Sequence, residues 1–165
     1  LDVMVGGEEK AVARARPVID CFAGRVVHTG PTGSGHAMKL LNNFVAMGYA
    51  AVYSEALALA GKAGLTPKVF DAVIRDGRMD CAFYRTFFKY VLERDRDAHK
   101  FALRNALKDM NYLAAFAQAT DVANPLQAAT RNSFATAVGL GRGDDYVPML
   151  SDIIAELNGV KPAGG

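Results

Sequence analysis

One long apolar stretch constrains this chain more than any other feature. From Gly35 to Ala63 the sequence contains no proline, and its only formal charges are those of Lys39, Glu55 and Lys62. A continuous helix over this range would be about 44 Å long at 1.5 Å rise per residue. Such a helix is unusually long for a domain of ordinary size, so the other elements have to be arranged around it.

Composition and charge exclude several classes of protein. Hydrophobic residues make up 51% of the chain and charged residues 22%, which is typical of a globular protein with a real core. The formal net charge is only +2, so nothing indicates a nucleic-acid-binding surface. The longest charge-free run of the long helix, Leu40 to Ser54, is shorter than the ~20 residues that cross a bilayer. We therefore expect neither nucleic acid nor a membrane as a partner.

The two cysteines, Cys21 and Cys81, lack the spacing of a metal site and lie in apolar sequence surroundings. We expect both thiols to be reduced and buried, without a disulfide. The three histidines are scattered along the chain, so we expect no metal site.

The residues before the long helix predict a β-α-β unit. Residues 1–7 and 25–29 read as short strands, and residues 8–22 between them read as a helix. Pro17 is expected to kink that helix or to end its first half. We therefore divide the chain into a β-α-β unit, residues 1–29, and a helical domain, residues 30–165.

After the long helix the sequence predicts only further helices, so the fold class is mainly all-α. Glycines and cap residues bound these helices: Gly64 ends the long one, and Thr66-Pro67 and Asn124-Pro125 are typical helix starts. The aromatic stripe of residues 81–92 is expected in the core, and the charged run 93–97 in a solvated loop. The expected helices are 66–76, 81–92, 101–119, 124–138 and one from Asp144 or Asp145 to Leu157, followed by a frayed tail at 161–165.

The position of Lys39 leaves two interpretations open. Asn43 lies four residues further on and His36 one turn before, so all three lie on one face of the helix. In the first interpretation Lys39 simply reaches solvent, with its stem along apolar neighbours. In the second it is a catalytic ammonium at a cleft. The glycine turn 30–35 and the free N–H groups of the helix N-terminus, which suit an acid group, favour the second.

Three segments resemble one enzyme family. Gly33 to Asn43, GSGHAMKLLNN, resembles the G-x-G-x-x-x-K-x-x-N-N signature of the β-hydroxyacid dehydrogenases, which include 3-hydroxyisobutyrate dehydrogenase and tartronate semialdehyde reductase. Leu1 to Gly7 is similar to the strand after that family's first substrate loop. Phe101 to Asp109 resembles its later F-x-L…K-D motif. The resemblance thus extends over nearly the whole chain.

This resemblance implies reversible oxidation of a small β-hydroxy acid with NAD or NADP. It implies that Lys39 transfers the hydroxyl proton, that Asn43, Gly33 and Gly35 bind the substrate, and that Lys108 contacts the cofactor. A lysine needs its pKa lowered from ~10.4 to serve as a base near neutral pH, and burial would achieve this. Sequence alone also permits Lys108 to be an ordinary solvated partner of Asp109.

The resemblance further implies a Rossmann domain in front of the helical domain. The chain contains no strand–G-x-G-x-x-G–helix unit, so residues 1–29 would be only a remnant of that domain. The cofactor would then be bound mainly by a missing N-terminal domain, and this chain alone should be inactive. We expect a cytoplasmic protein. We also expect a homodimer or homotetramer that buries the alanine-rich face of residues 50–60.

Two alternatives come from other functional classes. The chain could be a non-catalytic helical module of the same superfamily that serves dimerisation or ligand binding, although Lys39 and Asn43 favour an enzyme. It could also belong to a related imine reductase or phosphogluconate-type enzyme. The imine reductases typically replace the lysine, so Lys39 disfavours them.

Overall fold

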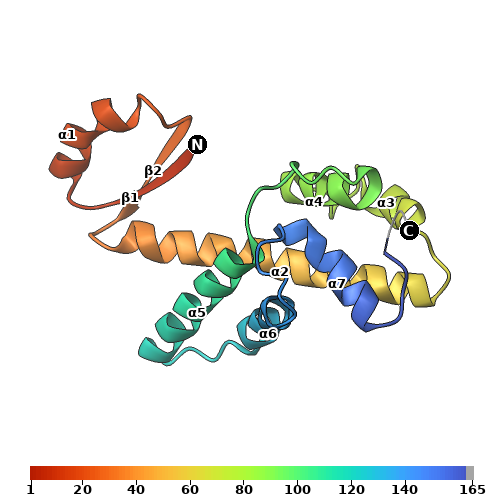
Figure 1. Ribbon diagram of the computed structural model, residues 1–165. Coiled ribbons are helices and arrows are strands. Elements are labelled where there is room, and N and C mark those ends of the chain that lie inside the picture. The colour runs from red at the N-terminus through yellow and green to blue at the C-terminus, as the bar shows by residue number, and fades with distance from the viewer. Residues whose placement is uncertain (163–165) are drawn as a thin grey trace. The chain divides into compact units, whose positions relative to one another are not determined.

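The computed structural model describes residues 1–162 (Figure 1), so residues 163–165 of the predicted frayed tail lie outside the described residues. The mainly helical fold class is confirmed, because the described residues form seven α-helices, one 3₁₀ turn and one two-stranded sheet. The chain divides into two compact units, Leu1–Asn43 and Phe44–Gly165, with the division inside the long helix. The two units are described separately.

The first unit contains the predicted β-α-β arrangement. Strands β1 (Asp2–Gly6) and β2 (Arg25–Gly30) pair in parallel, and helix α1 (Glu9–Ile19) connects them. Parallel strands need a crossover connection, which α1 provides. The His28 Nε2 atom lies 2.8 Å from the Gly7 carbonyl oxygen and 3.1 Å from that of Gly30, so this histidine holds the ends of the strands together.

Helix α1 differs from its prediction at its C-terminal end. It continues through Pro17 and ends at Ile19, rather than at Phe22, because the next residues form tight turns in which the Phe22 N–H donates to the Ile19 carbonyl (3.1 Å). Cys21 lies in these turns and is exposed, so the prediction that both cysteines are buried is wrong for Cys21. Cys81 is half-buried, and both thiols are free.

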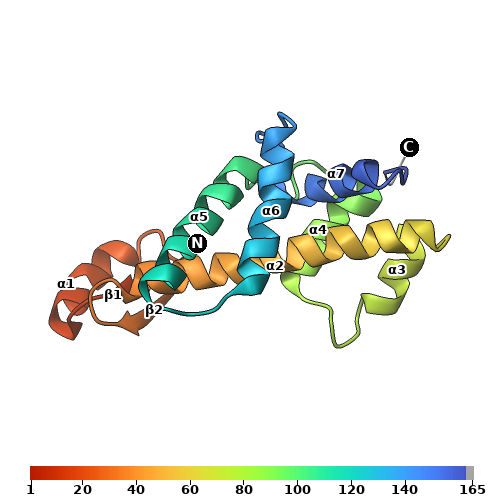
Figure 2. The same cartoon turned by 90° about the horizontal axis from the view of Figure 1, so that it is seen from below.

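The second unit consists of helices. The long helix α2 (Ser34–Lys62) begins one residue before its predicted start and extends into this unit from Phe44 onwards. Helices α5 and α6 pack closely against each other (Figure 2). The further elements are α3 (Pro67–Ile74), α4 (Ala82–Glu93), α5 (Leu103–Ala119), α6 (Pro125–Gly139), the 3₁₀ turn η1 (Val147–Met149) and α7 (Leu150–Leu157).

Aromatic side chains of α4 form the centre of the second unit, as predicted. Tyr84, Phe87 and Phe88 are almost completely buried, and the rings of Tyr84 and Phe88 stack with their centroids 4.2 Å apart. Tyr53 of α2 meets the Tyr84 ring edge-on at 5.3 Å. Fully burying each such ring stabilises the fold by about 1.5–3 kcal/mol, so this cluster fixes α4 against α2.

The alanine-rich face of α2 is covered within the chain. Ala50, Ala51, Ala58 and Ala60 are buried, and the buried Ser54 hydroxyl donates to the Ala50 carbonyl oxygen (2.7 Å). Small side chains let neighbouring helices approach this face closely. The prediction that residues 50–60 as a whole form a subunit contact is therefore wrong for these alanines.

The charged run 93–97 is not simply a solvated loop. Arg94, in the left-handed conformation that ends α4, directs its guanidinium to the buried carboxylate of Asp152 on α7. The Tyr90 hydroxyl also donates to this carboxylate, at 2.6 Å. Asp152 therefore joins α7 to α4, which the local charge pattern could not indicate.

Two helix boundaries were predicted correctly from local signals, namely the end of α2 before Gly64 and the start of α3 after Thr66. Gly64 has φ +76° after α2, and the Thr66 hydroxyl accepts the Val69 N–H at the start of α3. The predicted helix start at Asp144 or Asp145 is wrong. There the Asp145 carbonyl accepts the N–H of Leu103 (2.8 Å), so this backbone pairs with the start of α5 before η1 and α7 begin.

By length and composition alone, α2 (29 residues) is long and apolar enough to cross a bilayer. One such helix is weak evidence for a membrane, because core helices of soluble proteins meet the same criterion. A third of that window is already buried against protein.

Candidate active site

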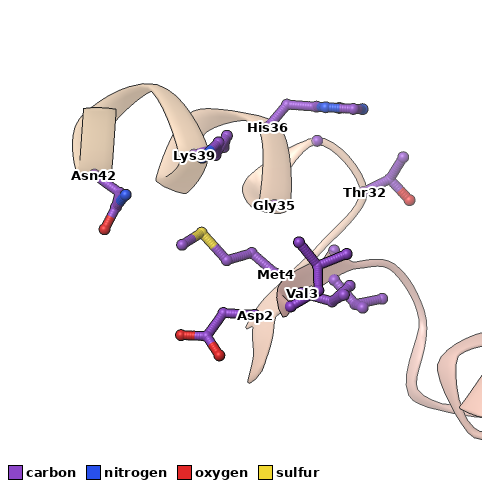
Figure 3. Close-up of a pocket in the computed structure, with 12 residues that line it drawn as sticks. Asp2, Val3, Met4, Thr32, Gly35, His36, Lys39 and Asn42 are labelled. Atoms are coloured by element: carbon purple, nitrogen blue, oxygen red, sulfur yellow. The ribbon is translucent and has the colours of Figure 1, made fainter. Parts of the chain in front are cut away.

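An open groove of about 790 Å³ lies in the first unit, between strand β1 and the first turns of α2 (Figure 3). Backbone and side chains of β1 form one wall, including Asp2 and Met4. The other wall comes from the glycine turn and the helix and consists of Thr32, Gly33, Gly35, His36, Lys39 and Asn42. The groove therefore lies where the sequence placed the candidate site.

Two glycines bring the walls of this groove together. A Cβ atom on Gly35 would lie 2.7 Å from the Met4 carbonyl oxygen, and one on Gly6 would lie 2.6 Å from the Ser34 Oγ atom. Real Cβ atoms essentially never approach so closely, so only glycine lets α2 start against β1. Ser34 is held from the other side by a 2.8 Å hydrogen bond with the Thr29 hydroxyl.

Replacing Gly35 with alanine should therefore destabilise the first unit. The added methyl group meets rigid backbone atoms, and overpacking of this kind costs about 1–3 kcal/mol. Amide hydrogen exchange in β1 should become faster and the thermal midpoint lower. Gly48→Ala is the matched control in the same helix, because nothing lies within 4 Å of its added Cβ. Equal exchange in both variants would contradict the close-packing role of Gly35.

Lys39 lines the groove, and its amine is not held in an ion pair by the described residues. Its side chain is exposed, and within residues 1–162 it takes part in no ion pair, unlike Lys89, Lys100 and Lys108. His36 and Asn42 lie three residues before and after Lys39 and line the same groove. The sequence analysis expected burial in the apolar helix to lower the pKa of this lysine. The described residues do not bury it.

The other predicted site residues of the first unit differ in burial and in their position relative to the groove. Asn43 is buried, with 8% of its surface exposed, and does not line the groove, whereas its neighbour Asn42 does. Gly35 is buried against β1, as its close contacts require. Gly33 is exposed with φ +93° and open space around it. The i, i+3 spacing from Lys39 is the signal that could have identified Asn42.

Lys108 lies on α5 in the second unit. Its Nζ atom is 3.2 Å from Asp109 Oδ1 and 5.9 Å from the centre of the Tyr112 ring, and about half of its side chain is exposed. The ion pair that the sequence allowed is therefore present but only partly solvated, because Asp109 is buried (9% exposed) while the Lys108 amine remains accessible to a ligand. Within the described part of the chain, no group of three or more His, Cys, Asp or Glu residues could hold a metal ion.

Comparisons with known proteins identify the family. The family model for the NAD-binding region of NADP-dependent 3-hydroxyisobutyrate dehydrogenase matches residues 33–152. 3-Hydroxyisobutyrate dehydrogenase of Pseudomonas aeruginosa is 33% identical over 140 residues, which are 81% of this chain and 47% of that protein. 2-(Hydroxymethyl)glutarate dehydrogenase of Eubacterium barkeri is 29% identical over 166 residues, which are 100% of this chain and 55% of that protein.

A solved structure agrees with these sequence relatives. The 3-hydroxyisobutyrate dehydrogenase of Mycobacterium tuberculosis, solved with L-serine, matches with a TM-score of 0.84 and 26% identity. That match covers 93% of this chain and 54% of the other, so the chain spans about half the length of the proteins it resembles. The chain belongs to the 3-hydroxyisobutyrate dehydrogenase family of NAD(P)-dependent β-hydroxyacid dehydrogenases.

Proposed function

We propose that a full-length protein containing this chain oxidises a small β-hydroxy acid reversibly to its semialdehyde or keto acid, with NAD or NADP. The single observation that carries the proposal is the position of Lys39 in a chain of this family: its exposed amine lies at the groove beside the glycine turn and forms no ion pair within residues 1–162. Lys89 and Lys100 are held by carboxylates, whereas this amine is available to a substrate hydroxyl, and the groove distinguishes it from surface lysines that likewise form no ion pair within residues 1–162, such as Lys10.

Each proposed site residue has a definite task. Lys39 takes the proton from the substrate hydroxyl during oxidation and returns it during reduction. A bound nicotinamide would supply the hydride acceptor for the carbon that carries this hydroxyl. The exposed backbone of Gly33 at the helix N-terminus suits the acid group of the substrate.

The remaining assignments follow the sequence resemblance. The resemblance assigns the orientation of the reacting hydroxyl to Asn43, although Asn43 is buried outside the groove and the adjacent Asn42 is the amide that lines it. Gly35 lines the groove and is assigned to the substrate side. Lys108 contacts the cofactor, and its accessible amine fits an anionic group. Most of the cofactor contacts would come from a dinucleotide-binding domain outside this chain, so we expect residues 1–165 alone to be inactive.

A purely non-catalytic module is the second candidate. The observation that favours it is the apolar surface that α2 leaves exposed in the second unit.

We also propose a cytoplasmic location, which the two free thiols support, and a homodimer or homotetramer.

The proposed activity can be tested on the full-length protein by following the formation of reduced nicotinamide. A β-hydroxy acid such as 3-hydroxyisobutyrate should be oxidised with NAD or NADP, whereas lactate, an α-hydroxy acid, should be a poor substrate. Residues 1–165 alone should give no turnover and no tight cofactor binding in calorimetry. A full-length protein that binds the cofactor but oxidises no β-hydroxy acid would favour the non-catalytic module.

A further inference from the structure

We propose that Tyr112 and Arg131 bind the nicotinamide cofactor together with Lys108. The Tyr112 ring stacks on an aromatic ring of the cofactor, and the Arg131 guanidinium holds one of its phosphates. The inference rests on the proposed function, in which Lys108 contacts the cofactor, and it adds two residues that the sequence resemblance does not assign. All three residues lie on α5 and α6 of the second unit.

Tyr112 offers an exposed aromatic ring close to the Lys108 amine. It lies four residues after Lys108 on α5, so the two side chains share one face of the helix. Tyr112 is 58% exposed, whereas the next residue, Leu113, is buried. The Lys108 Nζ atom lies 5.9 Å from the centre of the ring, which is at the outer limit of about 6 Å for a cation over an aromatic face. The amine therefore lies near the ring without covering it.

Arg131 of α6 is held beside the same part of α5. Its Nε atom donates to Asn111 Oδ1 at 2.5 Å, and Asn111 lies three residues after Lys108 and directly before Tyr112. This hydrogen bond joins two helices that pack closely against each other (Figure 2). Within residues 1–162 the terminal nitrogens of Arg131 form no hydrogen bond or ion pair. A guanidinium anchored at Nε can direct these two nitrogens at the oxygens of a phosphate.

The charges of the two helices suit an anionic ligand. Helices α5 and α6 contain one carboxylate, Asp109, and three cations, namely Arg104, Lys108 and Arg131. Arg104 is paired at 2.7 Å with Asp144, which lies outside both helices. The loop that joins the helices adds Asp121. Lys108, which is bound to Asp109 but half exposed, and Arg131 therefore remain as the cations that a ligand can reach.

An exposed aromatic ring beside two cations has the chemistry that binds a nucleotide. Flat bases stack on aromatic side chains, and lysine and arginine bind phosphates. Residues three or four apart on a helix have Cβ atoms about 5–6 Å apart, so one nucleotide can contact both the ring and the cations. Each half of the cofactor contains an aromatic ring joined through a ribose to a phosphate, so these residues fit the group.

The affinity of the full-length protein for NAD and NADP, measured by calorimetry without substrate, tests the inference independently of turnover. Tyr112→Ala should weaken binding roughly tenfold through loss of stacking, whereas Tyr112→Phe keeps the ring and should stay within about twofold. Arg131→Ala should also weaken binding roughly tenfold through loss of a charged contact. Lys68→Ala is the matched control, because Lys68 is an exposed cation of α3 that forms no ion pair within residues 1–162. Circular dichroism should show equal helicity for all four variants.

Competition by nicotinamide mononucleotide and by ADP-ribose identifies the half of the cofactor that Tyr112 contacts. That half should compete roughly tenfold less well in Tyr112→Ala than in the unaltered protein, and the other half should compete equally in both. A full-length protein that binds neither NAD nor NADP would contradict the proposed function itself. Normal cofactor binding that is unchanged in Tyr112→Ala or in Arg131→Ala, or that is weakened equally in Lys68→Ala, would overturn this inference alone.

Discussion

Replacing Lys39 with alanine in the full-length enzyme is expected to lower the rate of β-hydroxy acid oxidation by about 10²–10⁴-fold, which is the usual contribution of a positioned acid–base group. The lysine is exposed at the groove of the first unit and has no ion-pair partner among residues 1–162. Its removal should therefore lower kcat through the chemical step while leaving the fold unchanged. Steady-state kinetics in both directions would measure this effect.

Two control variants test whether Lys39 acts by proton transfer or only through its positive charge. Lys39→Arg keeps a positive charge but has a guanidinium that does not deprotonate in proteins, so it should remain nearly as slow as the alanine variant. Lys10→Ala removes an exposed lysine of α1 in the same unit and should have no effect on the rate. If Lys39→Ala retained a rate close to that of the parent enzyme, Lys39 would not be the proton-transfer group.

Asp152→Ala is expected to lower the free energy of unfolding by about 2–4 kcal/mol, which is more than the loss expected for Gly35→Ala. The carboxylate accepts hydrogen bonds from the Tyr90 hydroxyl and from the guanidinium of Arg94. Burial, and then this carboxylate, raise the pKa of Tyr90 to about 12, so its hydroxyl remains a donor. Removal of Asp152 leaves that buried hydroxyl without its acceptor, and α7 loses its link to α4.

The loss is below that of a fully buried pair because Arg94 can reach water. Its side chain is 38% exposed, so solvent screens part of the pair's contribution. The thermal midpoint of the chain should fall by roughly 5–12 °C. Asp144→Ala is the control, since Asp144 pairs with Arg104 at the surface and is 86% exposed. An equal fall in the thermal midpoint for both substitutions would show that the hydrogen bonds of Asp152 stabilise the fold no more than a surface ion pair does.

Local signals in the sequence predicted much of the fold. The β-α-β unit, the long α2 and the cap of α3 at Thr66 were all recognisable, because each depends on residues close together in the chain. The long-range link between Arg94 and Asp152 was not recognisable. The two residues are 58 positions apart, and only helix packing brings them together.

The candidate site shows the same division. The motif from Gly33 to Asn43 identified the family and the segment, and the groove lies at that segment. Sequence could not decide between Asn42, which lines the groove, and Asn43, which is buried, because they lie three and four residues after Lys39, both spacings are compatible with its face of the helix, and only packing selects between them. Nor could it show that Gly35 is needed for contact with β1.

The sequence by itself determined the family, the helical class and the lysine that the proposed chemistry needs, because periodicity and motif spacing are local properties. Only the tertiary structure decided what surrounds the long helix. It covers the alanine face with the chain's own helices, leaves Leu59 exposed beside an open groove, and leaves the Lys39 amine without an ion-pair partner among residues 1–162. Burial depends on which elements pack together, and that information lies in contacts between residues far apart in the chain.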